Sequence, residues 1–178
     1  MEVIAIAAQS LDGCITRHQA SGSSFASEAD RVWFAEALAG CDCLVMGRGT
    51  YVASRAFIRS RLTPDRCRHV LTRRPRDWVE DRVAGQLMFT DEAPAVLIDR
   101  LAEEGNQRCG VLGGAEIYSR LLLDGRLTRL WLTLEPRIFG QGIRLVNTAM
   151  DPPLQLKEAR PLEGGSLLLD YVVGTVSG

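Results

Sequence analysis

Gly113 and Gly114 stand between a short apolar run and a predicted helix, a position typical of a ligand-binding turn. A short apolar run ends at Leu112, Gly113-Gly114 follows, and residues 115–123 carry apolar side chains at helical spacing. Glycine lets the backbone approach a ligand closely, and the free N–H groups of a helix that begins there favour a phosphate. A Gly-Gly turn can also simply connect two elements, so this stretch alone leaves both interpretations open.

Two more loops have the same position after a short apolar run. Gly47 to Thr50 follows one run, and Thr72-Arg73 ends the next. Ligands of open α/β sheets bind in the crevice at the carboxyl ends of the strands. Arg48 and Arg73 can fork onto a phosphate, and the two threonines can donate to one. Together the loops predict a phosphorylated nucleotide, although each arginine taken singly is also compatible with a solvated surface position.

A carboxylate lies in the apolar face of a predicted helix. Residues 28–38 follow Ser27, a good N-cap, and Asp30 falls on the face that carries Trp33 and Phe34. A carboxylate in an apolar stripe is costly unless it is paired or functional, and burial would raise its pKa toward that of a proton donor. Ser27 and Asp30 also have capping-box spacing, in which Asp30 would only reach back to the backbone of Ser27. The two interpretations are evenly matched on these grounds.

The order of the elements predicts a single α/β domain over residues 1–178, with a mostly parallel sheet and antiparallel C-terminal edge strands. Strands are expected at 3–9, 42–46, 69–72 and 86–90, with a further short one that ends at Leu112. A half-buried strand of alternating leucines is expected at 130–135, and a closing antiparallel pair at 154–159 and 166–176. Helices are expected at 28–38, 93–104 and 115–123. The second of these is expected to bury Val96, Leu97 and Leu101, while residues 47–51 are expected to form a loop and residues 52–68 have no assigned element.

Composition narrows the functional classes. A net charge of −1 argues against a nucleic-acid-binding protein, and the apolar runs are too short to span a bilayer. The N-terminus has no signal-peptide pattern, and five cysteines without zinc or disulfide spacing predict no metal site and a reduced, cytoplasmic protein.

Several stretches, taken in order, resemble the dihydrofolate reductase superfamily over nearly the whole chain. They are Asp12 with Ile15, Asp30-x-x-Trp33-Phe34, Met46-Gly47-Arg48-x-Thr50-Tyr51, Leu71-Thr72-Arg73, Val111 to Gly114 with Ile117-Tyr118, and Leu130-x-Leu132-Thr133. The turn at 10–13 and Pro136-x-Ile138-x-Gly140-x-Gly142 look more like the reductase domain of the bifunctional riboflavin-biosynthesis deaminase/reductase, here in stand-alone form. The resemblance implies a dihydrofolate reductase-like three-layer α/β/α fold.

The same resemblance implies NADPH as cofactor and assigns residues to it. Ala8 and Ile15 would contact the nicotinamide, Gly47, Arg48 and Thr50 would hold phosphate, Leu71, Thr72 and Arg73 would surround the adenosine and its 2′-phosphate, and Gly113, Gly114, Ala115, Glu116, Ile117 and Tyr118 would cradle the pyrophosphate. Asp30 would be catalytic and would bind substrate together with Phe34, Arg61 and Thr133.

The resemblance thus implies an NADPH-dependent reductase of a pterin- or pyrimidine-type heterocycle, most like the 5-amino-6-(5-phosphoribosylamino)uracil reductase of riboflavin biosynthesis. A homodimer is expected on the same grounds. The alternatives are a dihydrofolate or dihydropterin reductase and a non-catalytic NADPH-binding protein on the same fold.

Overall fold

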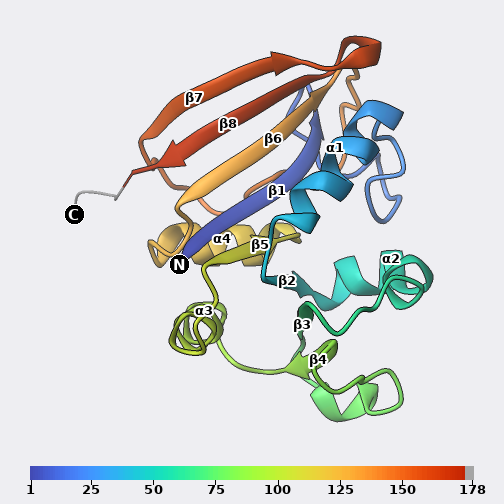
Figure 1. The fold of residues 1–178 in the computed structure, drawn as a ribbon. Helices are drawn as coiled ribbons and strands as arrows, with labels where there is room; N and C mark the ends of the chain where they lie inside the picture. Colours follow the sequence, from blue (N-terminus) through green and yellow to red (C-terminus); the bar gives the residue numbers. More distant parts are fainter. Residues whose placement is uncertain (175–178) are drawn as a thin grey trace.

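A computed structural model, which describes residues 1–174, shows one eight-stranded sheet flanked by helices (Figure 1). The strands are β1 (Glu2–Ser10), β2 (Cys43–Gly47), β3 (Cys67–Leu71), β4 (Leu87–Thr90), β5 (Arg108–Val111), β6 (Arg129–Glu135), β7 (Leu154–Pro161) and β8 (Leu167–Val173). The α-helices are α1 (Glu28–Ala39), α2 (Arg48–Arg59), α3 (Pro94–Glu103) and α4 (Ala115–Leu123), and two short 3-10 turns cover Pro75–Trp78 and Glu163–Gly165.

The sheet has the order β4-β3-β2-β5-β1-β6-β8-β7. The first six strands in this order pair in parallel, and β8 and β7 complete the sheet in antiparallel register. The prediction of a mostly parallel sheet with antiparallel C-terminal edge strands is therefore confirmed. One consequence is that the loops after β2, β3, β4 and β5 all emerge at the same edge.

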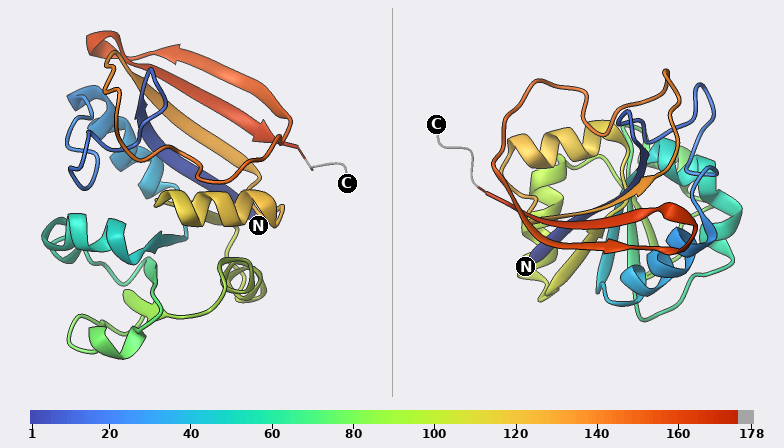
Figure 2. Two further views of the ribbon diagram at one scale, coloured as in Figure 1. Left: turned by 180° about the vertical axis from the view of Figure 1, so that it is seen from behind. Right: turned by 90° about the horizontal axis from the view of Figure 1, so that it is seen from above.

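Continuous apolar runs in the strands are explained by helices on both faces. Val3 and Ala5 of β1 pack into a core cluster with α3 and α4, whereas Ile4 and Ile6 pack on α1. The part of the second face near β3 and β4 is covered by α2 through a cluster around Tyr51. Figure 2 shows α1 and α4 on opposite sides of the sheet. The molecule thus has the three layers that were expected.

Helix α2 corrects the prediction of a loop at residues 47–51, and it extends to Arg59 in a segment that had no assigned element. The helix begins at Arg48, directly after β2, with Gly47 at the N-cap and no side chain of residues 1–174 capping it. A start without Ser, Thr, Asp or Asn lacks the usual sequence signal. The apolar face of the helix, with Tyr51 and Ile58 buried, is what holds it on the sheet.

Two smaller predictions about burial were wrong. Helix α3 buries Leu97, Ile98 and Leu101, while Val96 is 56% exposed. Strand β6 is covered on both faces rather than one, since Thr133 and Glu135 are at least as buried as Leu130 and Leu132 on the opposite face. The closing pair is observed as β7 and β8, and the predicted residues 175 and 176 of the last strand lie outside the described part of the chain.

The loop after β1 is tied to the long loop after β6. The carboxylate of Asp12 accepts hydrogen bonds from the backbone N–H groups of Phe139 (3.1 Å) and Gly140 (2.7 Å), and Ile15 N–H donates to the carbonyl of Ile143 (2.8 Å). A further bond from the Ser10 hydroxyl is the largest of the influences that lower the Asp12 pKa to about 2. Asp12 thus joins the two loops.

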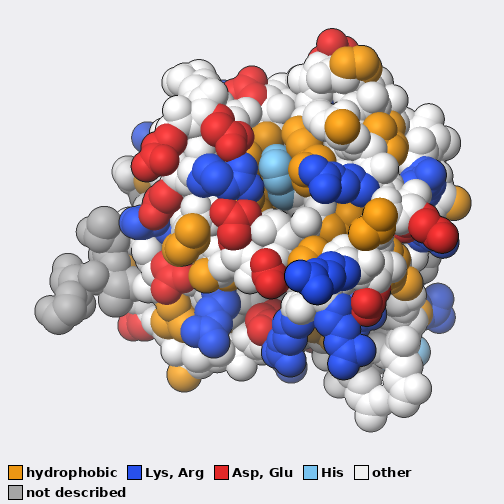
Figure 3. Space-filling view, turned by 90° about the horizontal axis from the view of Figure 1, so that it is seen from below, with side chains coloured by type: hydrophobic (Ala, Val, Ile, Leu, Met, Phe, Trp, Pro, Cys, Tyr) orange, Lys and Arg blue, Asp and Glu red, His pale blue; other side chains and the backbone are white. Residues whose placement is uncertain are grey.

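None of the helices in residues 1–174 has the length and apolar character needed to cross a membrane. The face on the side of α3 and β4 carries basic and acidic side chains interspersed with apolar groups (Figure 3). This mixture agrees with the near-zero net charge.

Candidate active site

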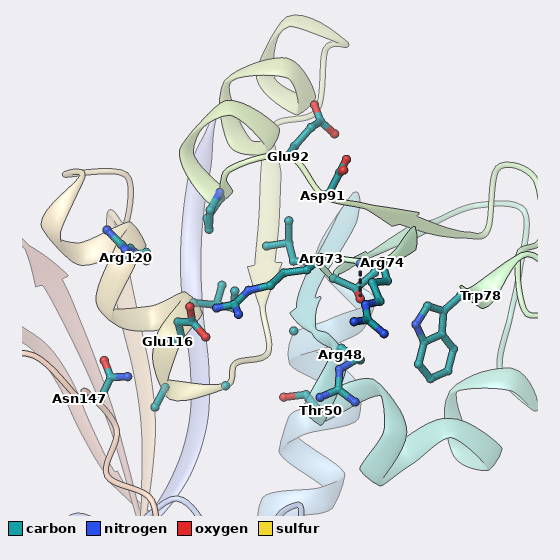
Figure 4. Close-up of a pocket in the computed structure, with 18 of the residues that line it drawn as sticks. Arg48, Thr50, Arg73, Arg74, Trp78, Asp91, Glu92, Glu116, Arg120 and Asn147 are labelled. Atoms are coloured by element: carbon teal, nitrogen blue, oxygen red, sulfur yellow. Dashed lines mark hydrogen bonds between the residues drawn. The ribbon is translucent and has the colours of Figure 1, made fainter. Parts of the chain in front are cut away.

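A cavity of about 970 Å³ lies at the edge of the sheet where the loops after β2, β3, β4 and β5 meet (Figure 4). The long loop after β6 contributes Ile143 and Asn147 to its wall. Ten of the residues predicted to bind the cofactor line it: Gly47, Arg48, Thr50, Leu71, Thr72, Arg73, Gly114, Ala115, Glu116 and Ile117. Three predicted phosphate-binding loops, far apart in the sequence, are therefore brought together.

Three helices begin at this cavity. The N-caps of α2, α3 and α4 are Gly47, Ala93 and Gly114, and no side chain within residues 1–174 caps any of them. The first N–H groups of a helix need an acceptor, and the helix dipole adds positive potential at that end. Uncapped helix starts that converge on one cavity suit a ligand with several phosphate oxygens.

Four arginines in the cavity wall make no ion pair with any residue of the described chain. They are Arg48, Arg73, Arg74 and Arg120. Figure 4 shows Arg73 extending toward α4, whereas Arg48 and Arg74 lie on the side of Trp78. Guanidinium groups without protein carboxylate partners are available to bind the oxygens of a phosphate in forked geometry.

Gly113 fits its position because it has no side chain. Its φ is +95°, and a Cβ there would lie 3.1 Å from the ring and from the hydroxyl of Tyr118. The Gly113–Gly114 peptide bond is cis, and the Gly113 carbonyl accepts a 2.6 Å hydrogen bond from Gly47 N–H. Tyr118 is itself fixed, since its buried hydroxyl donates to the carbonyl of Ile6 (2.7 Å). The Gly-Gly turn is thus held against β2 and, through Tyr118, linked to β1.

Trp78 forms one end of the cavity, and a buried network supports it. Its indole stacks on Phe89 with ring centroids 5.5 Å apart and packs edge-on against Tyr51. The Tyr51 hydroxyl donates to Asp81 (2.8 Å), and Arg55 donates to the same carboxylate (2.7 Å). These contacts fix the 75–83 segment on α2 and leave Trp78 as a rigid, half-buried aromatic wall.

Asp30 lies in the first turn of α1 and is buried, with 6% of its surface exposed. Burial raises the pKa of its carboxyl, and the charge of Glu135 raises it further, against the lowering effects of the Thr133 hydroxyl and Arg31. Its backbone N–H donates to the Ser27 hydroxyl (3.2 Å), but the backbone N–H of Ser27 donates to Glu135 and not to Asp30. Asp30 therefore supplies no reciprocal half of a capping box.

Thr133 is a second buried polar residue at the same place. It is fully buried, and its hydroxyl has no hydrogen-bond partner of standard geometry among residues 1–174. Thr133 is also the register partner of Ala8 on β1. A buried hydroxyl without a partner beside a buried carboxyl is a polar pair that a bound ring could satisfy.

The remaining predicted residues fall outside the cavity wall. Asp30, Phe34 and Thr133 lie on the α1 side of the sheet, Ala8 is beside Thr133, and Ile15 packs partly buried on the core. Gly113 belongs to the turn but not to the cavity wall, and Tyr118 packs against it. Arg61 is exposed, with its guanidinium 3.9 Å from the ring centroid of Phe57, and the structure does not bring it to either group of residues.

Sequence reasoning missed a second set of cavity residues. They are Arg74, Asp77, Trp78, Asp91, Glu92, Pro94 and Arg120. Asp91 and Glu92 follow β4, so the strand-end argument used for the other loops was sufficient to find them. Arg120 lies one helical turn after Glu116, and helical spacing alone was the available signal.

The family model for the RibD C-terminal domain matches residues 1–168. The chain belongs to this family. No curated protein sequence matches it significantly.

Solved structures similar to this RibD C-terminal-domain protein share its fold at low identity. A putative riboflavin biosynthesis protein from Shewanella sp. PV-4 has 18% identity and a TM-score of 0.74, covering 98% of this chain and 100% of its own. The deaminase/reductase of Thermotoga maritima has 17% identity and a TM-score of 0.76 over 97% of this chain, which spans 56% of that protein. A dihydrofolate reductase from Enterococcus faecalis complexed with NADP(H) has 18% identity and a TM-score of 0.71 over 98% and 97%. The dihydrofolate reductase-like fold expected from the sequence is confirmed.

Gly113→Ala is expected to destabilise the protein by about 1–3 kcal/mol, because a side chain at φ +95° is strained and would press on Tyr118. Thermal unfolding measures the effect. Gly49→Ala is the matched control, since a Cβ there meets nothing within 4 Å. Equal melting temperatures for Gly113→Ala and the wild type would contradict the structure of the turn.

Asp30→Asn is expected to stabilise the protein, increasingly so as the pH rises. The folded state keeps the Asp30 proton to a higher pH than the unfolded chain does, because its pKa is raised by burial. The free energy of unfolding of the wild type therefore falls between the ordinary aspartate pKa and the raised value, and the asparagine variant escapes this loss. Melting curves from pH 4 to pH 8 test it, with the exposed Asp151→Asn as control. A constant difference across that range would refute a buried, titrating Asp30.

Proposed function

We propose that the protein is an NADPH-dependent reductase of a flat heterocycle, comprising a single reductase domain, residues 1–178. The observation that carries the proposal is the cavity where three uncapped helix starts and four arginines without ion-pair partners in the described chain converge. Membership of the RibD C-terminal domain family and the fold shared with a dihydrofolate reductase that binds NADP(H) support the same conclusion.

The cavity residues fit a dinucleotide with an extra phosphate. In the proposal, the amino ends of α2 and α4 bind the pyrophosphate and Arg73 binds the 2′-phosphate, with Leu71 and Thr72 beside the adenosine. Trp78 offers a flat apolar wall at the same end. The nicotinamide would extend past Gly113 and Tyr118 toward Ala8 and Ile15, and its chemical contribution is hydride donation.

The substrate would bind on the α1 side of β1, next to Ala8. The ring would bind to the carboxyl of Asp30, whose pKa is raised, and to the buried hydroxyl of Thr133, and Phe34 gives an apolar surface for the ring. In the proposal, Asp30 orients the ring by hydrogen bonding and holds the proton that the reduced product needs. Arg61 would meet a substrate phosphate only if the ligand reached the surface near Phe57.

The preferred substrate class is a pyrimidine such as 5-amino-6-(5-phosphoribosylamino)uracil, the compound after which the reductase activity of the Thermotoga maritima protein is named. A pterin, as in dihydropterin or dihydrofolate reductase, is the second candidate because a buried carboxylate suits the adjacent N–H donors of an aminopterin edge. We also propose a cytoplasmic homodimer. Ile138 is 75% exposed, and the apolar residues Leu154 and Leu156 are exposed on the edge strand β7.

The direct test titrates the protein with NADPH and NADH and follows tryptophan fluorescence, with Trp78→Phe to identify the reporting side chain. NADPH-selective binding followed by oxidation of NADPH with a pyrimidine riboside or a pterin would support a reductase and name its substrate class. Binding without turnover of either class would favour the non-catalytic alternative. No binding of either cofactor would overturn the proposal.

Arg73→Ala is expected to weaken NADPH binding by about 1.5–3 kcal/mol, the range for a hydrogen bond to a charged group, while NADH binding barely changes. The reason is that the lost guanidinium contact involves the 2′-phosphate alone. Arg76→Ala, an exposed arginine three residues away and outside the cavity wall, is the matched control. Equal losses for the two cofactors would remove Arg73 from this role.

Asp30→Asn is expected to leave NADPH affinity intact and to lower the rate of reduction about 10²- to 10⁴-fold, the usual contribution of a positioned proton donor. Single-turnover kinetics with preloaded NADPH separate this loss from a binding defect. An unchanged rate would assign Asp30 a purely structural role.

A further inference from the structure

Glu135, at the end of β6, is a buried carboxylate without a counter-ion among the described residues. Only 1% of its surface is exposed, and no lysine or arginine in residues 1–174 forms an ion pair with it. Burying a charge costs free energy unless hydrogen bonds or a partner charge offset the loss of hydration. Its hydrogen bonds must therefore account for its position.

Both carboxylate oxygens of Glu135 bind groups at the start of α1 or beside it. One accepts from the backbone N–H of Ser27 (2.9 Å), and the other accepts from the hydroxyl of Ser166 (2.8 Å). The hydroxyls of Ser166 and Ser27 are 3.2 Å apart, and the Ser27 hydroxyl accepts from the N–H of Asp30 (3.2 Å). The chain of bonds from Asp30 through the two serines ends on Glu135, which as a carboxylate can only accept.

This arrangement leaves the carboxyl of Asp30 out of the helix cap. In a capping box, the side chain three residues after the N-cap accepts from the N-cap N–H. Asp30 has that spacing from Ser27, but Glu135, from a strand more than 100 residues away, takes its place. Glu135 therefore fixes the first turn of α1, and the side chain of Asp30 takes no part in capping it.

Two charged groups act on the Asp30 carboxyl among the described residues: Glu135 from β6 and Arg31 from α1 itself. The Arg31 side chain is 57% exposed and pairs with Glu28, so water and that carboxylate weaken its influence. Glu135 is shielded from water, and a like charge nearby disfavours ionisation of a carboxyl group. The contribution of β6 thus opposes loss of the Asp30 proton.

We propose that Glu135 is a positioning residue for the reaction: it anchors the amino end of α1 in place of Asp30, and its negative charge favours the proton-bearing form of Asp30. The consequence for catalysis rests on the proposed reductase function, but the effect of the Glu135 charge on the protonation of Asp30 does not depend on it. A purely structural Glu135 would provide the anchor without the electrostatic effect.

Glu135→Gln separates the two roles. The amide oxygen still accepts from Ser27 N–H, and Ser166 can accept from the amide nitrogen, so the anchor is kept while the charge is removed. The measurement is the carboxyl ¹³C shift of Asp30 against pH in cofactor-free protein, with Asp30→Asn to assign the signal. We expect the titration midpoint to move to lower pH in E135Q. An unchanged midpoint in folded E135Q would overturn the proposal, whether or not the protein turns over NADPH.

Glu28→Gln is the matched control, because it removes a carboxylate two residues from Asp30 whose side chain is 79% exposed. We expect the Asp30 midpoint to stay near the wild-type value in this variant. If E135Q does not fold, Glu135→Asp supplies the converse test, since it keeps the charge on a shorter side chain. The Asp30 midpoint must then stay raised, and an ordinary aspartate value in E135D would refute the electrostatic role.

In active enzyme, the pH at which kcat/KM falls should also move downward in E135Q, because the proton-bearing form of Asp30 is lost at a lower pH. A uniform decrease in kcat/KM at every pH, with no displacement of the profile, would indicate a structural role and contradict the inference. Failure of all variants and of the wild type to reduce any substrate would count against the proposed function and leave the NMR result to decide this one.

Discussion

Three helix starts at one edge of a parallel sheet are the constraint on which the rest of the structure depends. The parallel register of β2, β3, β4 and β5 delivers their carboxyl ends to the same edge, and α2, α3 and α4 begin there with no capping side chain in the described residues. The N–H groups left at these ends must bind water or a ligand. Glycine at two of the N-caps and the arginines around them suit an anion.

On the α1 side of the sheet, the notable groups are buried carboxyl and hydroxyl groups instead of arginines and helix starts. There Asp30 and Glu135 bring two carboxyl groups into a part of the core that is otherwise apolar, around Ile4 and Ile6, and the Thr133 hydroxyl has no hydrogen bond of standard geometry in the described chain. Each of these features costs stability. Buried polar groups that cost stability are retained most readily where they bind a substrate. The candidate site thus has two parts that meet at β1. One part offers positive charge and backbone N–H groups, and the other offers buried carboxyl and hydroxyl groups.

Much of the fold was accessible from the sequence because its signals are local. Ser27 and the apolar spacing of α1 indicated the helix and the inward position of Asp30, and Gly113-Gly114 marked the start of α4. Helix α2 was missed because its start lacks a capping residue. Glu135 was missed because it alternates with leucines, a pattern typical of the outer side of a half-buried strand. Its hydrogen-bond partners are Ser27, which is 108 residues away in the sequence, and Ser166, which is 31 residues away. No local sequence pattern reports such distant contacts. The roles assigned to individual residues in the site remain predictions.

The link between the loop after β1 and the loop after β6 has a consequence for how this protein can be modified. Asp12 binds two backbone N–H groups of the second loop, which in turn places Ile143 and Asn147 in the cavity wall. The hydrogen bonds that lower the Asp12 pKa to about 2 keep this carboxylate ionised at neutral pH. The two segments form one exchangeable unit. A graft from a relative that replaces residues 11–18 without residues 137–144 would separate the carboxylate from its N–H donors and displace the cavity wall. A graft that replaces both segments together would bring a matching carboxylate and donors.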